Sequence, residues 1–294
     1  MAPSGGAAIH RPEPRPGAGV LSCPVVFPEA GNDIGRRLST GGSVDGLLLI
    51  ELAGQLNLWV PNEAEGEAHW QHEEIFNLGC YDDIRLPENA LVFDVGANVG
   101  LFSLFVRSRY PKAEIHAFEP MPEVAKALRK NAELHDLADF HVTQCALGAH
   151  REEDVEFTYY PAIPGNSTRY PEDKELQIAV LSRDYPPDEV AHDHTGRPVR
   201  ATVERLSSFL AAGRTVDLLK VDVEGAELDV LRGIDDEHWG LVQQTILEVQ
   251  DLDNQLKDVV GMLESRGMTT RVQPSPLIPP DIRTYMVSGT RAAG

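Results

Sequence analysis

The stretch Phe93-Asp94-Val95-Gly96-Ala97-Asn98-Val99-Gly100 decides the fold. It ends the short apolar run 91–95 and leads into a segment with apolar residues at helical spacing, which Pro111 terminates. A strand, a glycine turn and a helix in this order form a βα unit. The glycines of such a turn let the backbone approach a nucleotide-like ligand closely.

Further strands and helices alternate along the chain after this unit. We predict four more strands, at residues 114–118, 140–146, 216–221 and 245–249. Helices are expected to begin at Pro122, Ala226 and Asp253. Two late strands, near residues 269–272 and 284–287, have no clear helix between them and should pair antiparallel. The pattern predicts an α/β fold.

The chain divides into three parts. Residues 1–42 are rich in proline and glycine and are predicted to form a flexible tail. Residues 43–90 contain two short apolar runs, typical of a β-hairpin, and then a helical segment at 63–78. Residues 91–294 form the main domain, with a polar, proline-rich insertion at about 150–202.

Composition limits the classes of partner and compartment. The 294 residues include 26 basic and 46 acidic side chains, a net charge of −20, which argues against nucleic acid or an anionic membrane as partner. Three scattered cysteines cannot form a disulfide framework and indicate a reducing compartment. No apolar run approaches the roughly 18 residues that a membrane helix needs. We therefore expect a cytoplasmic protein whose main partner is neither nucleic acid nor a membrane.

Two cofactors compete for the glycine turn. A dinucleotide requires the pattern GxGxxG, so that its pyrophosphate can lie at the helix N-terminus, but Asn98 occupies the second glycine position. The carboxylate of Asp94 would repel a pyrophosphate and would suit a sulfonium. The turn thus favours S-adenosylmethionine, and a nicotinamide dinucleotide is the alternative.

Glu119 is a second candidate for cofactor binding. It ends the predicted second strand, 23 residues after Gly96. A carboxylate at this place in a doubly wound sheet accepts hydrogen bonds from the ribose hydroxyls of an adenosine cofactor. Glu119 therefore predicts an adenosine site without distinguishing between the two cofactors.

Charged residues also follow the strand predicted at 216–221. Period-two alternation places Lys220, Asp222 and Glu224 on one side of the extended chain, at the same edge of the sheet as the glycine turn. Glu248, at the end of the next strand, would join them. This group is either functional or an internally paired cluster in which Lys220 neutralises a carboxylate.

The combination of motifs resembles the FkbM-type family of S-adenosylmethionine-dependent methyltransferases. The motifs are DVGANVG (94–100), FEP (118–120), CALG (145–148), LLKVDVEGAELDVLRG (218–233) and ILEV (246–249). The resemblance implies a class I, Rossmann-like sheet of seven strands with an antiparallel last strand, preceded here by the hairpin and helix. Many family members O-methylate hydroxyls of polyketides, macrolides or sugars. The resemblance therefore implies an O-methyltransferase of natural-product biosynthesis.

The resemblance also implies roles for individual residues. Glu119 would hold the ribose, and Cys145 with Ala146 would contact the adenine edge. The residues expected around the methionine part of the cofactor are those of the glycine turn: Asp94, Gly96, Ala97, Asn98 and Gly100.

Methyl transfer to a hydroxyl requires a positioned acceptor oxygen and a general base. We favour the acids Asp222, Glu224 and Glu248, with Asp222 holding the cofactor or the acceptor and Glu224 nearer the proton. His192 and His194 of the insertion are alternative bases.

No metal is expected, because the histidine pairs in the sequence lack a third and a fourth ligand. A divalent ion bound by Asp222 and Glu248 remains an alternative. A catalytically silent S-adenosylmethionine-binding protein in a biosynthetic assembly is the alternative to an enzyme.

Overall fold

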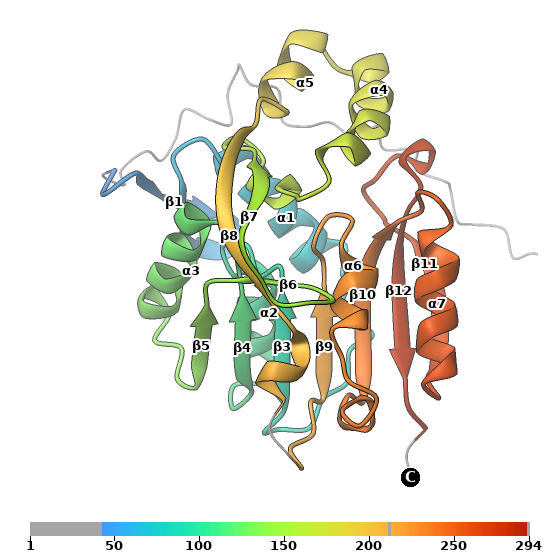
Figure 1. Cartoon of the computed structure of the whole chain (residues 1–294). Helices are drawn as coiled ribbons and strands as arrows, with labels where there is room; N and C mark the ends of the chain where they lie inside the picture. Colours follow the sequence, from blue (N-terminus) through green and yellow to red (C-terminus); the bar gives the residue numbers. More distant parts are fainter. Residues whose placement is uncertain (1–42, 211–212, 293–294) are drawn as a thin grey trace, which may run out of the picture.

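The computed structural model describes residues 43–210 and 213–292. A seven-stranded sheet with the order β11-β12-β10-β9-β3-β4-β5 forms its centre (Figure 1). Its parallel strands are β3 (Leu91–Val95), β4 (Glu114–Phe118), β5 (Phe140–Thr143), β9 (Leu218–Val221) and β10 (Gln244–Gln250). β12 (Thr284–Thr290) is antiparallel to both of its neighbours, β10 and β11 (Thr269–Pro274). This arrangement confirms the predicted class I sheet with a reversed last strand.

Helices cover both faces of the sheet, because the central strands are apolar on both sides. One face packs against the N-terminal hairpin, α2 (Leu101–Arg109) and α3 (Pro122–Leu134). The other face packs against α6 (Glu227–Arg232) and α7 (Gln255–Ser265) (Figure 1). Strand alternation therefore decides which side chains face α2 and which face α6 and α7.

The N-terminal hairpin is confirmed and packs against the main sheet. β1 (Leu47–Leu52) pairs antiparallel with β2 (Leu56–Pro61). Asn131 of α3 donates to the carbonyls of Trp59 and Val99, at 2.9 and 2.8 Å, and so joins the hairpin to the glycine turn. Residues 1–42, predicted to be a tail, lie outside the described residues.

α1 (Glu65–His72) follows the hairpin and continues into a π-helical turn, Glu73–Asn77. The predicted helix at 63–78 is therefore present, with its last turn wound more widely than an α-helix. His72 is buried in this segment and stacks on Phe76 at 4.8 Å, so it is a core histidine.

The insertion is more ordered than its composition indicates. β6 (Ala146–Leu147), β8 (Arg197–Glu204) and β7 (Glu152–Tyr159) form a second, three-stranded sheet. Between β7 and β8 the chain forms α4 (Lys174–Asp184) and α5 (Pro187–Asp193), which lie above the carboxyl ends of the parallel strands (Figure 1). The sequence predicted an insertion here but none of these elements.

The predicted strand at 140–146 is wrong in its second half. β5 ends at Thr143, and Ala146 and Leu147 pair with β8 in the other sheet. A tight turn, in which the backbone N–H of Cys145 donates to the carbonyl of Thr143 at 3.1 Å, redirects the chain. Neither glycine nor proline marks this turn, so the sequence pattern does not reveal it.

Within the described residues, no helix combines the length and the apolar character needed to cross a membrane. Cys80 and Cys145 are free thiols, and Cys23 lies outside the described part of the chain.

Candidate active site

A cavity of about 1570 Å³ opens at the carboxyl ends of β3, β4, β9 and β10. The strand ends form its floor, α1 forms one wall, and α4, α5 and the connection between β11 and β12 cover it. Most of the residues predicted from the sequence line it: Gly96, Ala97, Asn98, Glu119, Cys145, Ala146, Asp222, Glu224 and Glu248. The fold thus brings together residues from five separate motifs.

Asp94 and Gly100 do not line this cavity. Asp94 is fully buried on the face of β3 that α2 covers, where Ser103 Oγ donates to its Oδ2 at 2.6 Å. Gly100 precedes α2 with φ +97°, and a Cβ there would lie 2.7 Å from Leu128 Cδ1. Both residues therefore pack on the side of the glycine turn that faces away from the cavity. From the sequence, both were expected around the methionine part of the cofactor.

Gly96 is required by a close approach between two strand ends. Its φ is +75°, and a Cβ at this position would lie 1.7 Å from the carbonyl oxygen of Asp222. The N–H groups of Gly96 and Ala97 both donate to the carbonyl of Phe118 at 3.0 Å. The turn after β3 therefore contacts both the end of β4 and the residue that follows β9. The backbone at the ends of β3, β4 and β9 thus lies close together in the floor of the cavity.

Glu119 is fixed by backbone donors. Its Oε1 accepts from the N–H of Met121 at 2.8 Å and its Oε2 from the N–H of Asn98 at 3.0 Å. Burial raises the pKa of Glu119 to about 7, although these two hydrogen bonds act in the opposite direction. Each carboxylate oxygen retains a lone pair for a ligand, because each accepts only one backbone bond.

Lys220 is paired inside the cluster. It lies opposite Asp94 in the β3–β9 register, and its ammonium is 3.5 Å from Asp94 Oδ1 and 3.5 Å from Asp222 Oδ2. It also donates to the carbonyl of Gly96 at 2.7 Å. Burial opposes the charged form, but the two carboxylates outweigh it and raise the pKa of Lys220. The charge of Asp94 is therefore balanced by Lys220.

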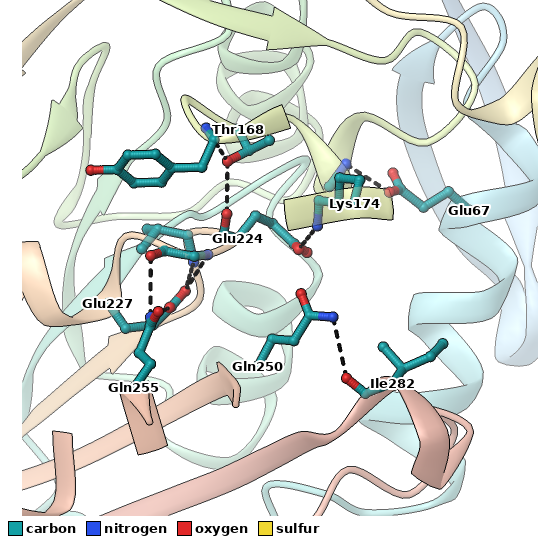
Figure 2. A network of polar contacts seen from close by, with 12 residues as sticks. Glu67, Thr168, Lys174, Glu224, Glu227, Gln250, Gln255 and Ile282 are labelled. Atoms are coloured by element: carbon teal, nitrogen blue, oxygen red, sulfur yellow. Dashed lines mark hydrogen bonds and ion pairs between the residues drawn. The ribbon is translucent and has the colours of Figure 1, made fainter. Parts of the chain in front are cut away.

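Glu224 pairs with a residue of the insertion, whereas Lys220 pairs with Asp94 and Asp222. β9 ends at Val221, and Glu224 has φ +56°, so the predicted period-two alternation does not extend this far. Its carboxylate forms an ion pair with Lys174, a 2% exposed residue at the start of α4 (Figure 2). Thr168 Oγ1 donates to the carbonyl of Glu224 at 2.7 Å. Glu224 therefore fastens the insertion to the floor of the cavity.

Several charged residues of the cavity were not predicted from the sequence, among them Lys174, Glu67 and Glu74. Glu67 Oε1 accepts from the N–H of Gly165 at 2.7 Å, and its Oε2 accepts from Asn98 Nδ2 at 3.3 Å. Burial raises the pKa of both Glu67 and Glu74 to about 8. Their spacing of seven residues, which places them on one helix face, was the available signal.

The described residues contain a cluster of three metal-ligating groups within 4.8 Å of one another: Glu114, His116 and His141. It lies on β4 and β5, is partly exposed, and includes no acid of the cavity. Glu114 also forms an ion pair with Arg214.

The sequence model of the methyltransferase FkbM domain matches residues 94–269, which span the sheet from β3 to the start of β11. The chain belongs to the FkbM methyltransferase family. It is a methyltransferase with a class I fold, and S-adenosylmethionine is its cofactor. This membership agrees with the family resemblance of the motifs, and it leaves the dinucleotide alternative without support.

Three relatives match this chain over most of their length. "Methyltransferase 1" of Beauveria bassiana is 37% identical over 82% of this chain and 97% of its own. "Methyltransferase sdnD" of Sordaria araneosa is 40% identical over 68% of this chain and 82% of its own. "31-O-demethyl-FK506 methyltransferase FkbM" of Streptomyces tacrolimicus is 36% identical over 78% of this chain and 92% of its own.

Proposed function

We propose that this FkbM-family methyltransferase transfers a methyl group to a hydroxyl of a small molecule, such as a polyketide, a macrolide or a sugar-bearing natural product. The observation that carries the proposal is the position of Asp222 and Glu248. Asp222 follows β9, Glu248 lies near the end of the neighbouring parallel strand β10, and both line the cavity beside the glycine turn. Two carboxylates at this place suit a neutral acceptor that must lose a proton.

The residues of the cavity fit S-adenosylmethionine. The carboxylate of Glu119 is oriented by two backbone donors and suits two ribose hydroxyls. Asn98 Oδ1 is buried and has no hydrogen-bond partner among the described residues, so it is available to a donor on the ligand. In this proposal Gly96, Ala97 and Asn98 lie along the methionine part, and Cys145 and Ala146 contact the adenine edge. When bound, the cofactor supplies an electrophilic methyl group.

The acids divide into two roles in this proposal. Asp222 and Glu248 face the acceptor, where they orient its hydroxyl and remove its proton. Glu224 is a positioning residue, because its ion pair with Lys174 occupies its carboxylate and holds the insertion over the acceptor. This changes the assignment made from the sequence, in which Glu224 was placed nearer the proton.

The name of the Streptomyces tacrolimicus relative supports a hydroxyl acceptor, since that protein is described as a methyltransferase of 31-O-demethyl-FK506. The large cavity supports an acceptor of similar bulk. Apolar side chains of α4, α5 and the β11–β12 connection, among them Leu181, Val190 and Ile282, line its cover.

Methyl-labelled S-adenosylmethionine tests the proposal. The protein is incubated with 31-O-demethyl-FK506 and with a panel of macrolactones and glycosides, and the labelled position is located by mass spectrometry. We expect label on oxygen, and Asp222→Asn should reduce turnover about 100-fold or more while cofactor affinity changes little. Asp236→Asn is the control, because Asp236 is exposed and forms an ion pair with Arg266, which does not line the cavity. Label on nitrogen or carbon, or full turnover by Asp222→Asn, would refute the assignment.

A further inference from the structure

Asn98, in the glycine turn, is held by two acids and has one polar atom left over. Its backbone N–H donates to Glu119 Oε2 at 3.0 Å, and its side-chain Nδ2 donates to Glu67 Oε2 at 3.3 Å. Its Oδ1 is buried and has no hydrogen-bond partner among the described residues. The backbone has φ +47°, in the left-handed region that asparagine adopts more readily than most residues. Asn98 therefore offers a fixed acceptor to a ligand.

Glu67 joins three separate segments of the chain. It lies on α1, and its Oε2 contacts Asn98 of the glycine turn, while its Oε1 accepts from the backbone N–H of Gly165 at 2.7 Å (Figure 2). Gly165 belongs to the short turn Pro164–Asn166 of the insertion. A Cβ on Gly165 would lie 2.6 Å from Glu67 Oε1 and 3.1 Å from Asn98 Nδ2, so the insertion packs directly on this pair. All three residues line the cavity.

The donors around Glu67 decide which way the Asn98 amide points. The N–H of Gly165 is a backbone donor, so the Glu67 oxygen that faces it must accept. An ionised carboxylate has no proton to donate, so its second oxygen also requires a donor and selects Nδ2 of Asn98 over Oδ1. With Nδ2 engaged by Glu67, the acceptor Oδ1 is left for another partner.

A bound cation would strengthen this arrangement. Burial raises the pKa of Glu67 to about 8, while the hydrogen bonds from Gly165 and Asn98 favour the ionised form. A positive charge beside Asn98 would favour the ionised form further, because a nearby opposite charge lowers the pKa of a carboxyl group. The environment of Glu67 therefore suits a cationic group at Asn98 better than a neutral one.

S-adenosylmethionine carries hydrogen-bond donors at three places: the ribose hydroxyls, the amino group of adenine and the ammonium of the methionine part. In the proposed placement of the cofactor, Glu119 holds the ribose hydroxyls, and the adenine edge lies at Cys145 and Ala146. Asn98 lies along the methionine part in that placement. The donor that remains for its Oδ1 is the ammonium.

We infer that Glu67 is a positioning residue for the cofactor, and that it holds the Asn98 amide with Oδ1 directed to the ammonium of the methionine part. The inference rests on the placement of the cofactor in the proposed function. Glu67 precedes residues 94–269, the part matched by the family model, so the N-terminal segment takes part in cofactor binding. Through Gly165, the same carboxylate also fixes the insertion next to the cofactor.

Calorimetric titration at pH 8.5, where Glu67 with its pKa of about 8 is mostly ionised, tests the inference. One ligand is S-adenosylhomocysteine, whose ammonium is its only positive charge. The other is its deaminated analogue, in which hydrogen replaces the amino group. Glu67→Gln should weaken binding of S-adenosylhomocysteine about 10-fold or more, because the glutamine's nitrogen would face Asn98 Nδ2 and turn the amide around. The affinity of the deaminated analogue should change less than about threefold.

Glu65→Gln is the matched control. Glu65 lies on the same helix, is exposed and does not line the cavity, so neither affinity should change. The double variant Glu67→Gln/Asn98→Asp reverses the polarity of the contact. The glutamine's nitrogen then donates to one oxygen of the aspartate, and the other oxygen can accept from the ammonium. This variant should bind S-adenosylhomocysteine within about threefold of the wild type, and it tests the inference even if Glu67→Gln alone does not fold.

Three results would overturn the inference: an equal loss of both ligands in Glu67→Gln, unchanged binding of both, or no recovery in the double variant. Asn98→Gly tests the placement of the cofactor separately, because glycine keeps the positive φ and removes Oδ1. If Asn98→Gly still prefers S-adenosylhomocysteine to its deaminated analogue as the wild type does, the ammonium does not reach Asn98 and the proposed placement fails. If Asn98→Gly loses that preference while Glu67→Gln keeps it, the placement holds and only the role of Glu67 is refuted.

Discussion

Replacing Lys220 by methionine is expected to lower the free energy of unfolding by about 3–5 kcal/mol at neutral pH, the usual cost of removing one partner of a buried ion pair. Lys220 is 4% exposed, and its ammonium donates to Gly96 O at 2.7 Å and lies 3.5 Å from one oxygen of Asp94 and one of Asp222. Methionine has a similar volume, so little of the loss comes from packing. Asp94, which is 0% exposed, would retain only its bond from Ser103.

The double variant Asp94→Asn/Lys220→Met separates charge from shape. Removing both charges should restore about 2 kcal/mol relative to Lys220→Met, the coupling expected of residues in contact. The deficit of Lys220→Met should also shrink as the pH is lowered, because protonation neutralises the carboxyl that has lost its cation. In the double variant this dependence on pH should be weaker.

Equilibrium unfolding in urea, followed by tryptophan fluorescence at pH 5.5 and 7.5, measures these differences. Lys112→Met is the control, because Lys112 is 63% exposed and pairs with an exposed glutamate, and its loss should cost less than about 0.5 kcal/mol. A cost below about 1 kcal/mol for Lys220→Met would refute the argument. The same conclusion follows if the double variant recovers no stability.

Three further predictions concern the cavity. Affinity for S-adenosylmethionine, measured by calorimetry, should rise between pH 6 and pH 8, because the pKa of Glu119 is about 7 and the ribose hydroxyls donate to its ionised form; Glu119→Gln should weaken binding by about 1.5–3 kcal/mol and remove this trend. Gly96→Ala should cost at least about 1–3 kcal/mol in thermal unfolding, since its φ is +75° and its Cβ would lie 1.7 Å from the backbone carbonyl oxygen of Asp222, and an unchanged melting temperature would contradict this. Lys174→Met should cost about 3–5 kcal/mol because it leaves Glu224 unpaired, and adding Glu224→Gln should recover part of the loss.

The strands of the main sheet could be predicted because their signals are local. The bounds of β3 and β4 agree with the prediction, since β3 is mostly apolar, β4 alternates polar and apolar residues, and a glycine or a proline soon follows each. The two late strands paired antiparallel as expected from the absence of a helix between them. β5 was extended too far, because the turn at Cys145 depends on backbone hydrogen bonding and on pairing with β8, more than 50 residues away in the chain.

The insertion could not be predicted for a related reason. β7 carries exposed charged residues along much of its length, and its partner β8 lies on the other side of two helices in the chain. A strand that is half exposed and pairs with a distant segment has a weak pattern of its own. The same holds for α4, whose first residue, Lys174, is buried although lysine is rarely found inside proteins.

The sequence by itself determined the family, the cofactor and most of the cavity floor. The glycine turn and the acids at or near the carboxyl ends of β4, β9 and β10 belong to short motifs, and the carboxyl ends of parallel strands meet at one edge of a sheet. Only the tertiary structure decided the charge state of that floor. In the folded chain Asp94 pairs with Lys220, Glu224 pairs with Lys174, and Glu74 and Glu248 both line the cavity. These outcomes depend on which distant segments pack together and on which buried charges find a partner, and neither is encoded in the spacing of residues along the chain.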